Sequence, residues 1–361
     1  MSKSKYDPES DFAKQYEDKL AHQKRPTILV AGYTGAGKTT LIQSICGKEV
    51  VPDCRIGAGL PQTQDFNFYE NALIRFWDSK GLEPGDSEKG FIERTNAFVR
   101  RLQDDANVDN HIHLAWYTIQ GPGARVTPCD LRLIKEIFPN VLVLITKADI
   151  TKPRQKADMI EVLLNEGLPE SRILLSSEND EVSLKKVVNV SYELLPEAYR
   201  DAFVSAQRID FDTKRLRGQI AIHSAAAAAA AAGAFPLPVS DALVITPIQV
   251  GLVASLAIIF GEDIERLRIA LAPILLQEVG VLTASSLTKM VPGLGSVIQA
   301  TVAAGLTEAL GQLLFEYLVR RSKARLEARV PPELSFDWGM FIKLFKDARN
   351  RRFETVGAPP N

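Results

Sequence analysis

The chain has 361 residues, enough for two domains with substantial cores. Its 43 Lys and Arg residues nearly balance 44 Asp and Glu residues, so bulk charge argues neither for nor against a nucleic-acid partner. Cys46, Cys54 and Cys129 lack metal-ligand spacing, and their odd number fits reduced cytosolic thiols better than a disulfide framework. The polar, charged N-terminus predicts that no secretory signal peptide is present.

Residues 1–25 are predicted to form a charged helical arm. Phe12, Tyr16 and Leu20 recur every four positions, which is the spacing of one narrow apolar stripe on a helix. We expect the arm to dock through that stripe.

From residue 26 to residue 200, short apolar runs alternate with amphipathic segments. This alternation predicts an α/β domain with a mostly parallel sheet and helices on both faces. The runs 65–69 and 72–77 are separated by two residues, which predicts a hairpin and one antiparallel edge strand. The predicted strands are Thr27–Ala31, Asp65–Tyr69, Ala72–Trp77, Ile112–Thr118, Val141–Ile145 and Ile173–Leu175. The predicted helices are Lys38–Cys46, Glu88–Asp104, Asp130–Ile137, Gln155–Glu166 and Val182–Leu195.

The segment Gly32–Thr39 reads Gly-Tyr-Thr-Gly-Ala-Gly-Lys-Thr and follows the first predicted strand directly. It matches G-x-x-x-x-G-K-[ST], the phosphate-binding loop (P-loop), between a buried strand and a helix as that motif requires. The glycines allow backbone N–H groups to point at phosphate oxygens, and the following helix dipole adds to the attraction. Lys38 is expected to contact the β- and γ-phosphates, and the Thr39 hydroxyl is expected to bind Mg²⁺. The segment predicts nucleotide binding without naming the base.

A second motif, Asp78-Ser79-Lys80-Gly81, follows the third predicted strand about forty residues after the P-loop lysine. Ligands of open α/β sheets bind at the carboxyl ends of the strands, so this segment should lie beside the P-loop. The Asp78 carboxylate can hold Mg²⁺ through a water, and the Gly81 N–H can contact a γ-phosphate.

The run Val141–Ile145 ends in Thr146-Lys147-Ala148-Asp149, which favours recognition of guanine over a simple helix cap. A carboxylate at Asp149 accepts hydrogen bonds from the guanine N1–H and 2-amino groups, which adenine does not offer. The stem of Lys147 can cover the ring. Because a buried carboxylate without those donors would be costly, we expect the site to reject ATP. An ATPase is the open alternative.

These three motifs resemble the first, third and fourth motifs of GTPases of the Era-like (TrmE/Era/septin-type) superfamily, with Thr146 in place of the commoner Asn. The resemblance implies GTP/GDP and Mg²⁺ as cofactors. It also implies that Thr63 is the switch-one threonine and that Ser176-Ser177 is the fifth motif, whose backbone contacts guanine. The implied nucleotide contacts are Gly32, Tyr33, Thr34, Gly35, Ala36, Gly37, Lys38, Thr39, Thr40, Thr146, Lys147, Asp149, Ser176 and Ser177. The implied catalytic groups are Lys38, Thr63, Asp78 and Gly81, and the implied Mg²⁺ ligands are Thr39, Thr63 and Asp78.

Leu82 stands where Ras-like enzymes carry a water-orienting Gln. A leucine cannot hydrogen-bond the attacking water. Some Era-like GTPases use a potassium ion held by a P-loop Asn, but Gly35 occupies that position here. We therefore expect slow GTP hydrolysis, accelerated by self-association through this domain, as in a homodimer, or by a partner. No basic, aromatic-interleaved surface in residues 26–200 indicates nucleic-acid binding.

Residues 201–330 are predicted to form an apolar helical domain. Ala225–Ala232 is an unbroken run of alanines, the strongest helix formers, and residues 242–261 contain no charged side chain. Breaks at Phe235–Pro238 and Pro292–Ser296 suggest a duplicated helical hairpin. The segment resembles an uncharacterised helical domain found after many bacterial Era-like GTPases.

Two interpretations of this helical half stay open. It is either a soluble bundle with small-residue contacts, binding a protein partner, or a membrane-associated unit, since twenty uncharged residues can span a bilayer. The tail, residues 331–361, interleaves aromatic and basic side chains. The tail therefore fits either a terminal helix packed on the bundle or an amphipathic helix on an anionic membrane. The corresponding functions are a cytoplasmic nucleotide-dependent switch and a GTP-driven, dynamin-like assembly or membrane module.

Overall fold

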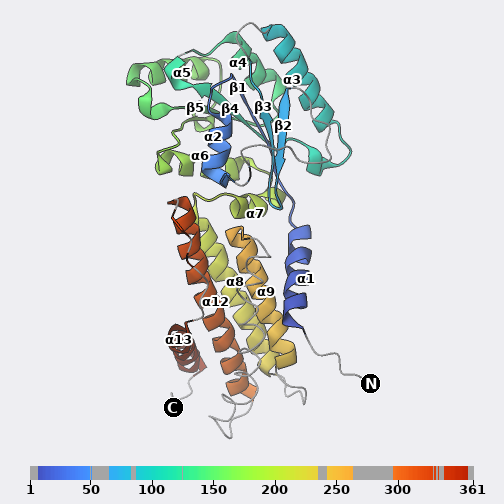
Figure 1. Cartoon of the computed structure of the whole chain (residues 1–361), viewed down its shortest axis with the longest axis vertical. Coiled ribbons are helices and arrows are strands. Elements are labelled where there is room, and N and C mark those ends of the chain that lie inside the picture. The colour runs from blue at the N-terminus through green and yellow to red at the C-terminus, as the bar shows by residue number, and fades with distance from the viewer. Residues whose placement is uncertain are drawn as a thin grey trace. The chain divides into compact units, whose positions relative to one another are not determined.

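The structure, a computed structural model, describes residues 7–48, 50, 65–82, 87–123, 125–234, 242–262, 296–327, 329–330, 332 and 337–356 (Figure 1). The chain divides into two compact units. One unit, here called the sheet unit, is Gln23–Asp210. The second, the helical unit, combines Met1–His22 with Phe211–Asn361.

The sheet unit contains a six-stranded sheet in the order β2-β3-β1-β4-β5-β6. β2 pairs antiparallel with β3 at one edge, and every other pair is parallel. The mostly parallel sheet and its single antiparallel edge strand are thereby confirmed. β1, β4 and β5 are apolar along nearly their whole length because both faces of the sheet are covered. The strands are β1 (Thr27–Gly32), β2 (Phe66–Glu70), β3 (Arg75–Ser79), β4 (Leu114–Gln120), β5 (Val141–Thr146) and β6 (Ile173–Leu175).

Helices cover both faces of this sheet (Figure 1). On one face, Leu29, Tyr117 and Val143 belong to a buried cluster with side chains of α3, α4 and α5. On the other face, Trp116 donates a hydrogen bond to the Ser191 hydroxyl of α6 at 2.9 Å. The helices of this unit are α2 (Lys38–Cys46), α3 (Glu88–Gln103), α4 (Pro128–Arg132), α5 (Pro153–Asn165), α6 (Glu181–Leu194) and α7 (Glu197–Ala206). The free thiols Cys46 and Cys129 are buried, and Cys54 lies outside the described residues.

Most predicted elements are shifted by one or two residues at their ends, and two differ more. β3 begins at Arg75 rather than Ala72, because Asn71 accepts hydrogen bonds from the Leu73 and Ile74 N–H groups and makes a four-residue turn. Leu73 and Ile74 are apolar because the turn itself is buried. The helix predicted over 130–137 is α4 followed by one π-helical segment, η3 (Leu133–Ile137), in which Phe138 N–H donates to the Leu133 carbonyl at 3.2 Å.

The helical unit packs long helices against one another. α12 contacts α8, α9 and α13, and α1 packs on α9. Phe12 and Tyr16 of α1 are buried, and Leu20 is half-buried, as the four-residue spacing predicts. The helices are α1 (Pro8–Ala21), α8 (Phe211–Ala234), α9 (Ala242–Phe260), α12 (Ser296–Leu326) and α13 (Trp338–Val356). Both predicted helix breaks, and with them the suspected duplication, lie outside the described residues apart from Ser296.

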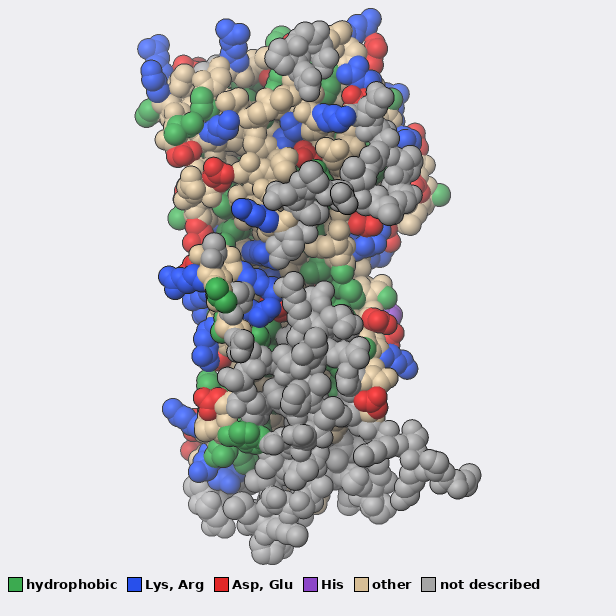
Figure 2. Space-filling model, viewed as in Figure 1, with side chains coloured by type: hydrophobic (Ala, Val, Ile, Leu, Met, Phe, Trp, Pro, Cys, Tyr) green, Lys and Arg blue, Asp and Glu red, His purple; other side chains and the backbone are tan. Residues whose placement is uncertain are grey.

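The basic C-terminal helix α13 is docked on α12. Phe341, Phe345 and Ala348 are buried, and Phe345 lies against Gly305 of α12, where a Cβ would come within 3.3 Å of its ring. Exposed Lys and Arg side chains of α12 and α13 lie along the side of the helical unit that carries these helices (Figure 2). Among the described residues, one helical stretch, Gln299–Leu326, is long and apolar enough to cross a membrane, but 72% of its most apolar window is buried inside the unit.

Candidate functional site

The P-loop connects β1 to α2 through three glycines with positive φ. These are Gly32, Gly35 and Gly37, with φ of 144°, 78° and 83°. At Gly32 there is also no room for a side chain, because a Cβ would lie 2.2 Å from the Thr118 carbonyl oxygen of β4. The glycines therefore let the loop fold tightly against the sheet and start α2 at Lys38.

Lys38 is buried under the loop that precedes it. Its ammonium donates to the carbonyl oxygens of Gly32 at 3.1 Å and Tyr33 at 2.9 Å. Burial lowers the pKa of Lys38, and the nearby Asp78 carboxylate opposes this change. A cation held by two loop carbonyls is placed to bind phosphate oxygens that approach the loop.

Thr39 and Asp78 meet next to Lys38, as the first and third motifs predict. The Thr39 hydroxyl donates to Asp78 Oδ2 at 2.7 Å. Asp78 Oδ1 is buried without a hydrogen-bond partner among the described residues. Burial raises the pKa of Asp78, while the Thr39 hydrogen bond and the Lys38 charge lower it. A hydroxyl beside a carboxylate with an unpaired buried oxygen fits a hard, oxygen-seeking cation such as Mg²⁺.

The segment after Asp78 lies against the P-loop. Thr34 donates its N–H to the Leu82 carbonyl at 3.4 Å and its hydroxyl to the Lys80 carbonyl at 3.2 Å. Gly81 is close to the loop with a φ of 90°. The Leu82 side chain is buried in the apolar cluster on one face of the sheet. This leucine therefore belongs to the core and offers nothing to an attacking water.

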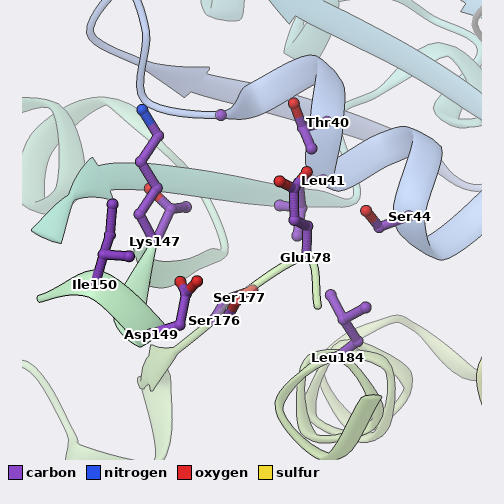
Figure 3. Close-up of a pocket in the computed structure, with 12 residues that line it drawn as sticks. Thr40, Leu41, Ser44, Lys147, Asp149, Ile150, Ser176, Ser177, Glu178 and Leu184 are labelled. Carbon is purple, nitrogen blue, oxygen red and sulfur yellow. The ribbon is translucent and has the colours of Figure 1, made fainter. Parts of the chain in front are cut away.

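A cavity of about 290 Å³ opens beside the P-loop at the carboxyl ends of β5 and β6. The P-loop helix α2 forms one side, and the segments that follow β5 and β6 form the other (Figure 3). The lining residues are Gly37, Thr40, Leu41, Ser44, Thr146, Lys147, Asp149, Ile150, Ser176, Ser177, Glu178 and Leu184. The first, fourth and fifth motifs thus converge on one pocket next to Lys38.

The end of β5 is tied to the P-loop by two side chains. The Thr146 hydroxyl donates to the Ala36 carbonyl at 2.8 Å, and the Lys147 ammonium donates to the Gly35 carbonyl at 3.0 Å. Lys147 has a φ of 53°, which turns the following residues toward the cavity. A threonine at position 146 therefore still links this motif to the P-loop.

Asp149 lies at the mouth of the cavity and is exposed (Figure 3). The protein itself therefore does not bury this carboxylate. The turn after Lys147 places the carboxylate at the rim, so only a bound base could cover it.

The fifth motif also differs in detail from the expectation. The Ser177 N–H donates to the Ser183 hydroxyl of α6 at 3.1 Å, so this backbone donor has an intramolecular partner. The Ser176 carbonyl accepts from the Ala148 N–H at 3.1 Å and joins this loop to the fourth motif. Both serines are buried and line the cavity.

One predicted site residue, Thr63, lies outside the described residues. Sequence reasoning did not identify Leu41, Ser44, Ile150, Glu178 and Leu184 as pocket residues. Ile150 and Glu178 directly follow motif residues, and that adjacency was the available signal. Leu41, Ser44 and Leu184 lie on helices, where residues that pack in the core are of the same types, so the sequence does not mark them as pocket residues.

Comparison with known proteins agrees with this geometry. A model of the family described as "50S ribosome-binding GTPase" matches residues 27–147. Septin-2B of Xenopus tropicalis and Septin-2A of Xenopus laevis are each 25% identical over 165 residues, covering 39% of this chain and 46% of theirs. The chain thus aligns with less than half the length of these curated relatives. A dimerisation-deficient mutant of Toc33 from Arabidopsis thaliana aligns at 16% identity with a TM-score of 0.33, covering 54% of this chain and 91% of that one. Together, the sheet order, the P-loop and the family match show that this chain carries a domain with the fold of a P-loop GTPase.

Proposed function

We propose that this protein binds guanine nucleotides through the cavity beside the P-loop and hydrolyses GTP slowly, as an Era-like switch coupled to its helical unit. The observation that carries the proposal is that Lys147 and Asp149 line one cavity with Gly37, the P-loop residue directly before Lys38. Phosphates would lie against the loop and α2, and the base would occupy the cavity at the ends of β5 and β6.

Guanine selectivity rests on Asp149. Its carboxylate offers two acceptors at the cavity mouth, which match the N1–H and 2-amino donors of guanine. The Lys147 stem lies beside it and can cover one face of the ring (Figure 3). Adenine would leave the carboxylate covered but without donors, which is unfavourable.

Asp149→Asn tests this assignment. We expect the variant to lose roughly ten-fold or more in GTP affinity and to gain affinity for xanthosine triphosphate, because xanthine carries an oxygen where guanine carries its 2-amino group. Asp158→Asn, an exposed position on α5, is the matched control and should behave as wild type. If wild-type protein prefers ATP, or if Asp149→Asn leaves nucleotide choice unchanged, the chain is not a GTP-binding protein of this kind.

Thr39 and Asp78 are the described residues that would hold Mg²⁺, together with Thr63 from the expected switch-one segment. Bound there, the ion would neutralise phosphate charge that develops during hydrolysis. Lys38 would stabilise the β- and γ-phosphate oxygens from the loop side, and the Gly81 N–H would contact the γ-phosphate.

Slow turnover follows from the burial of Leu82 in the core, since its side chain cannot orient water. We therefore expect self-association or a partner to supply the missing group. The rate of phosphate release per molecule should rise with protein concentration. Fast hydrolysis by dilute protein, at a rate independent of concentration, would contradict this part of the proposal.

A second candidate is a GTP-driven assembly or membrane module. The observation in its favour is the apolar stretch Gln299–Leu326 of α12, which is long enough to cross a bilayer. The burial of most of that stretch within the helical unit makes a cytoplasmic switch the preferred proposal.

A further inference from the structure

The P-loop residue Tyr33 is fixed by a hydrogen-bonded chain that the predicted motifs do not include. Its ring packs against the apolar cluster of the sheet, and its hydroxyl lies 3.0 Å from the Thr127 hydroxyl. Thr127 is the N-cap of α4, 94 residues further along the chain. This contact therefore joins the nucleotide loop to the start of another helix.

The neighbours of Thr127 set the direction of this hydrogen bond. The Thr127 hydroxyl lies 2.8 Å from Asp130 Oδ2, to which it donates, and it accepts from the Asp130 N–H at 3.2 Å. Since a threonine hydroxyl has one hydrogen, Tyr33 must be the donor to Thr127. Burial raises the pKa of Tyr33 to about 12, which is consistent with a hydroxyl that keeps its proton.

Asp130 is the last residue in this series of hydrogen bonds, and its carboxylate is buried, with the residue only 1% exposed. Besides the Thr127 hydroxyl, it accepts from the Thr127 N–H at 2.7 Å and from the Tyr117 hydroxyl of β4. The buried Cys129 thiol is a second neighbour of the Tyr33 hydroxyl. The acceptor for Tyr33 is thus anchored to both α4 and the central sheet.

The backbone of Tyr33 is part of the phosphate site itself. Its carbonyl accepts from the Lys38 ammonium at 2.9 Å and from the Ala36 N–H at 3.1 Å. The orientation of this peptide therefore determines where Lys38 lies. The ring and hydroxyl of Tyr33 thus hold the first turn of the loop on its α4 side, in addition to the hydrogen bonds that Thr34 makes to the Lys80 and Leu82 carbonyls.

We propose that Tyr33 is a positioning residue, which holds the P-loop and Lys38 in their phosphate-binding arrangement through its hydrogen bond to Thr127 and the buried Asp130. This inference rests on the proposed nucleotide-binding function and adds a residue that acts through its neighbours rather than on the base. It also adds the start of α4 to the places where the loop is coupled to the rest of the sheet unit.

The test is the dissociation rate of a fluorescent GDP analogue from the full chain. Tyr33→Phe removes one hydroxyl and leaves the Thr127–Asp130 cap complete, so the fold should be retained. A neutral hydrogen bond of ordinary net strength corresponds to an increase in dissociation rate of roughly two- to ten-fold. Thr127→Ser keeps the acceptor and should retain the wild-type rate, whereas Thr127→Val should accelerate release. The double variant of Tyr33→Phe and Thr127→Val should release GDP no faster than Thr127→Val alone, because both changes break the same bond.

Tyr199→Phe is the matched control. Its hydroxyl donates to the Asp109 carboxylate at 2.8 Å in the same unit, beside residues that precede β4, so losing it removes a hydrogen bond at least as strong away from the P-loop. This variant should release GDP at the wild-type rate. An unchanged rate for Tyr33→Phe, or an equal acceleration by Tyr199→Phe, would overturn the positioning role. If wild-type protein bound no guanine nucleotide, the proposed function would fail first, and this outcome is distinct from the other two.

Discussion

At the scale of single residues, Gly81 approaches the P-loop too closely to leave room for a side chain. A Cβ at Gly81 would lie 2.6 Å from the Thr34 nitrogen, 2.7 Å from the Gly32 carbonyl oxygen and 2.8 Å from the Lys38 ammonium. Its φ of 90° adds backbone strain for any L side chain. The segment that follows Asp78 can therefore reach the phosphate site only with glycine at this position.

Gly81→Ala should both destabilise the sheet unit and impair nucleotide binding. We expect a loss of roughly 2–4 kcal/mol in the free energy of unfolding, from strain together with displacement of the loop. Gly167→Ala is the matched control, since Gly167 has a φ of 87° and nothing within 4 Å of its Cβ position. It should cost about 1 kcal/mol from strain alone and leave GDP binding intact. Urea denaturation measures the loss of stability, and GDP titration measures the loss of binding. Equal losses in Gly81→Ala and Gly167→Ala would show that the close contacts around Gly81 do not matter.

The chemistry-bearing residues of the site were largely predictable, because short motifs fix their spacing. Thr39 and Asp78 do meet, and Lys147 does contact the P-loop. The role of Tyr33 was not predictable, since its partner Thr127 is distant in sequence and is an ordinary helix cap by itself. The hydrogen bond of the Ser177 N–H also depends on a packing detail of α6 that no motif encodes.

At the scale of elements, His113 fixes the start of β4 in its neutral form. Its Nδ1 accepts from the Thr27 N–H at 2.9 Å, its Nε2 lies 3.2 Å from the Val108 carbonyl, and its ring packs on Tyr199. Burial lowers the pKa of His113 to about 4, with Asp109 acting in the opposite direction and His111 and Arg75 reinforcing the decrease. Between pH 6.5 and 4, the unfolded chain therefore binds a proton that the folded chain does not.

Because the unfolded state binds more protons in that window, stability falls as the pH decreases from about 6.5 toward 4. We expect His113 to contribute a loss of roughly 2 kcal/mol over this range. His113→Gln removes the titration, so the stability difference between wild type and variant should shrink as the pH falls. Urea denaturation at several pH values measures the difference, and a difference independent of pH would show that His113 is not responsible.

Elements were predicted best where burial on both sides forces apolar runs, as in β1 and β5. The prediction was wrong where apolar residues are buried by a turn, as at Leu73 and Ile74, because hydrophobicity reports burial rather than strand geometry. The π-helical segment after α4 was also missed, since its i→i+5 hydrogen bonding has no signature in the residue pattern.

One acidic residue adds polar contacts to the apolar packing of α13 on α12. Glu308 of α12 is buried and accepts from Arg351 at 3.0 Å and from Arg352 at 2.8 Å. Burial alone would raise the pKa of Glu308, but the hydrogen bonds and charges of Arg352 and Arg351 hold it below its usual value. Two basic residues of the tail are thereby paired within the helical unit.

Glu308→Ala should loosen α13. We expect a loss of roughly 1–2 kcal/mol in the free energy of unfolding and faster proteolytic cleavage within α13, because both arginines lose a partner. Glu327→Ala is the matched control, since its pair with Arg329 is exposed and should contribute almost nothing. Equal protease resistance of Glu308→Ala and wild type would mean that apolar contacts alone hold the helix.

At the scale of the whole molecule, the open question is whether the helical unit meets a membrane. Among the described residues of this unit, most large apolar side chains of α9 and α13 are covered: Phe341 and Phe345 are buried on α12, Leu252 and Leu256 are buried inside the unit, and Ile342 is exposed. Transfer to a bilayer would exchange one apolar environment for another. The gain in free energy from the hydrophobic effect would therefore be small.

We therefore expect vesicles to leave GTP hydrolysis unchanged. Phosphate release by the full chain is measured during titration with neutral vesicles and with vesicles containing anionic lipid, followed by sedimentation at low and high salt. Attraction of the exposed basic side chains to anionic vesicles should be lost at high salt, since such contacts are screened. Residues 23–210 alone are the control and should not sediment under any of these conditions. Stimulation of several-fold by lipid, with sedimentation that survives high salt, would contradict the switch and favour the membrane module, because only insertion of the apolar helices resists salt.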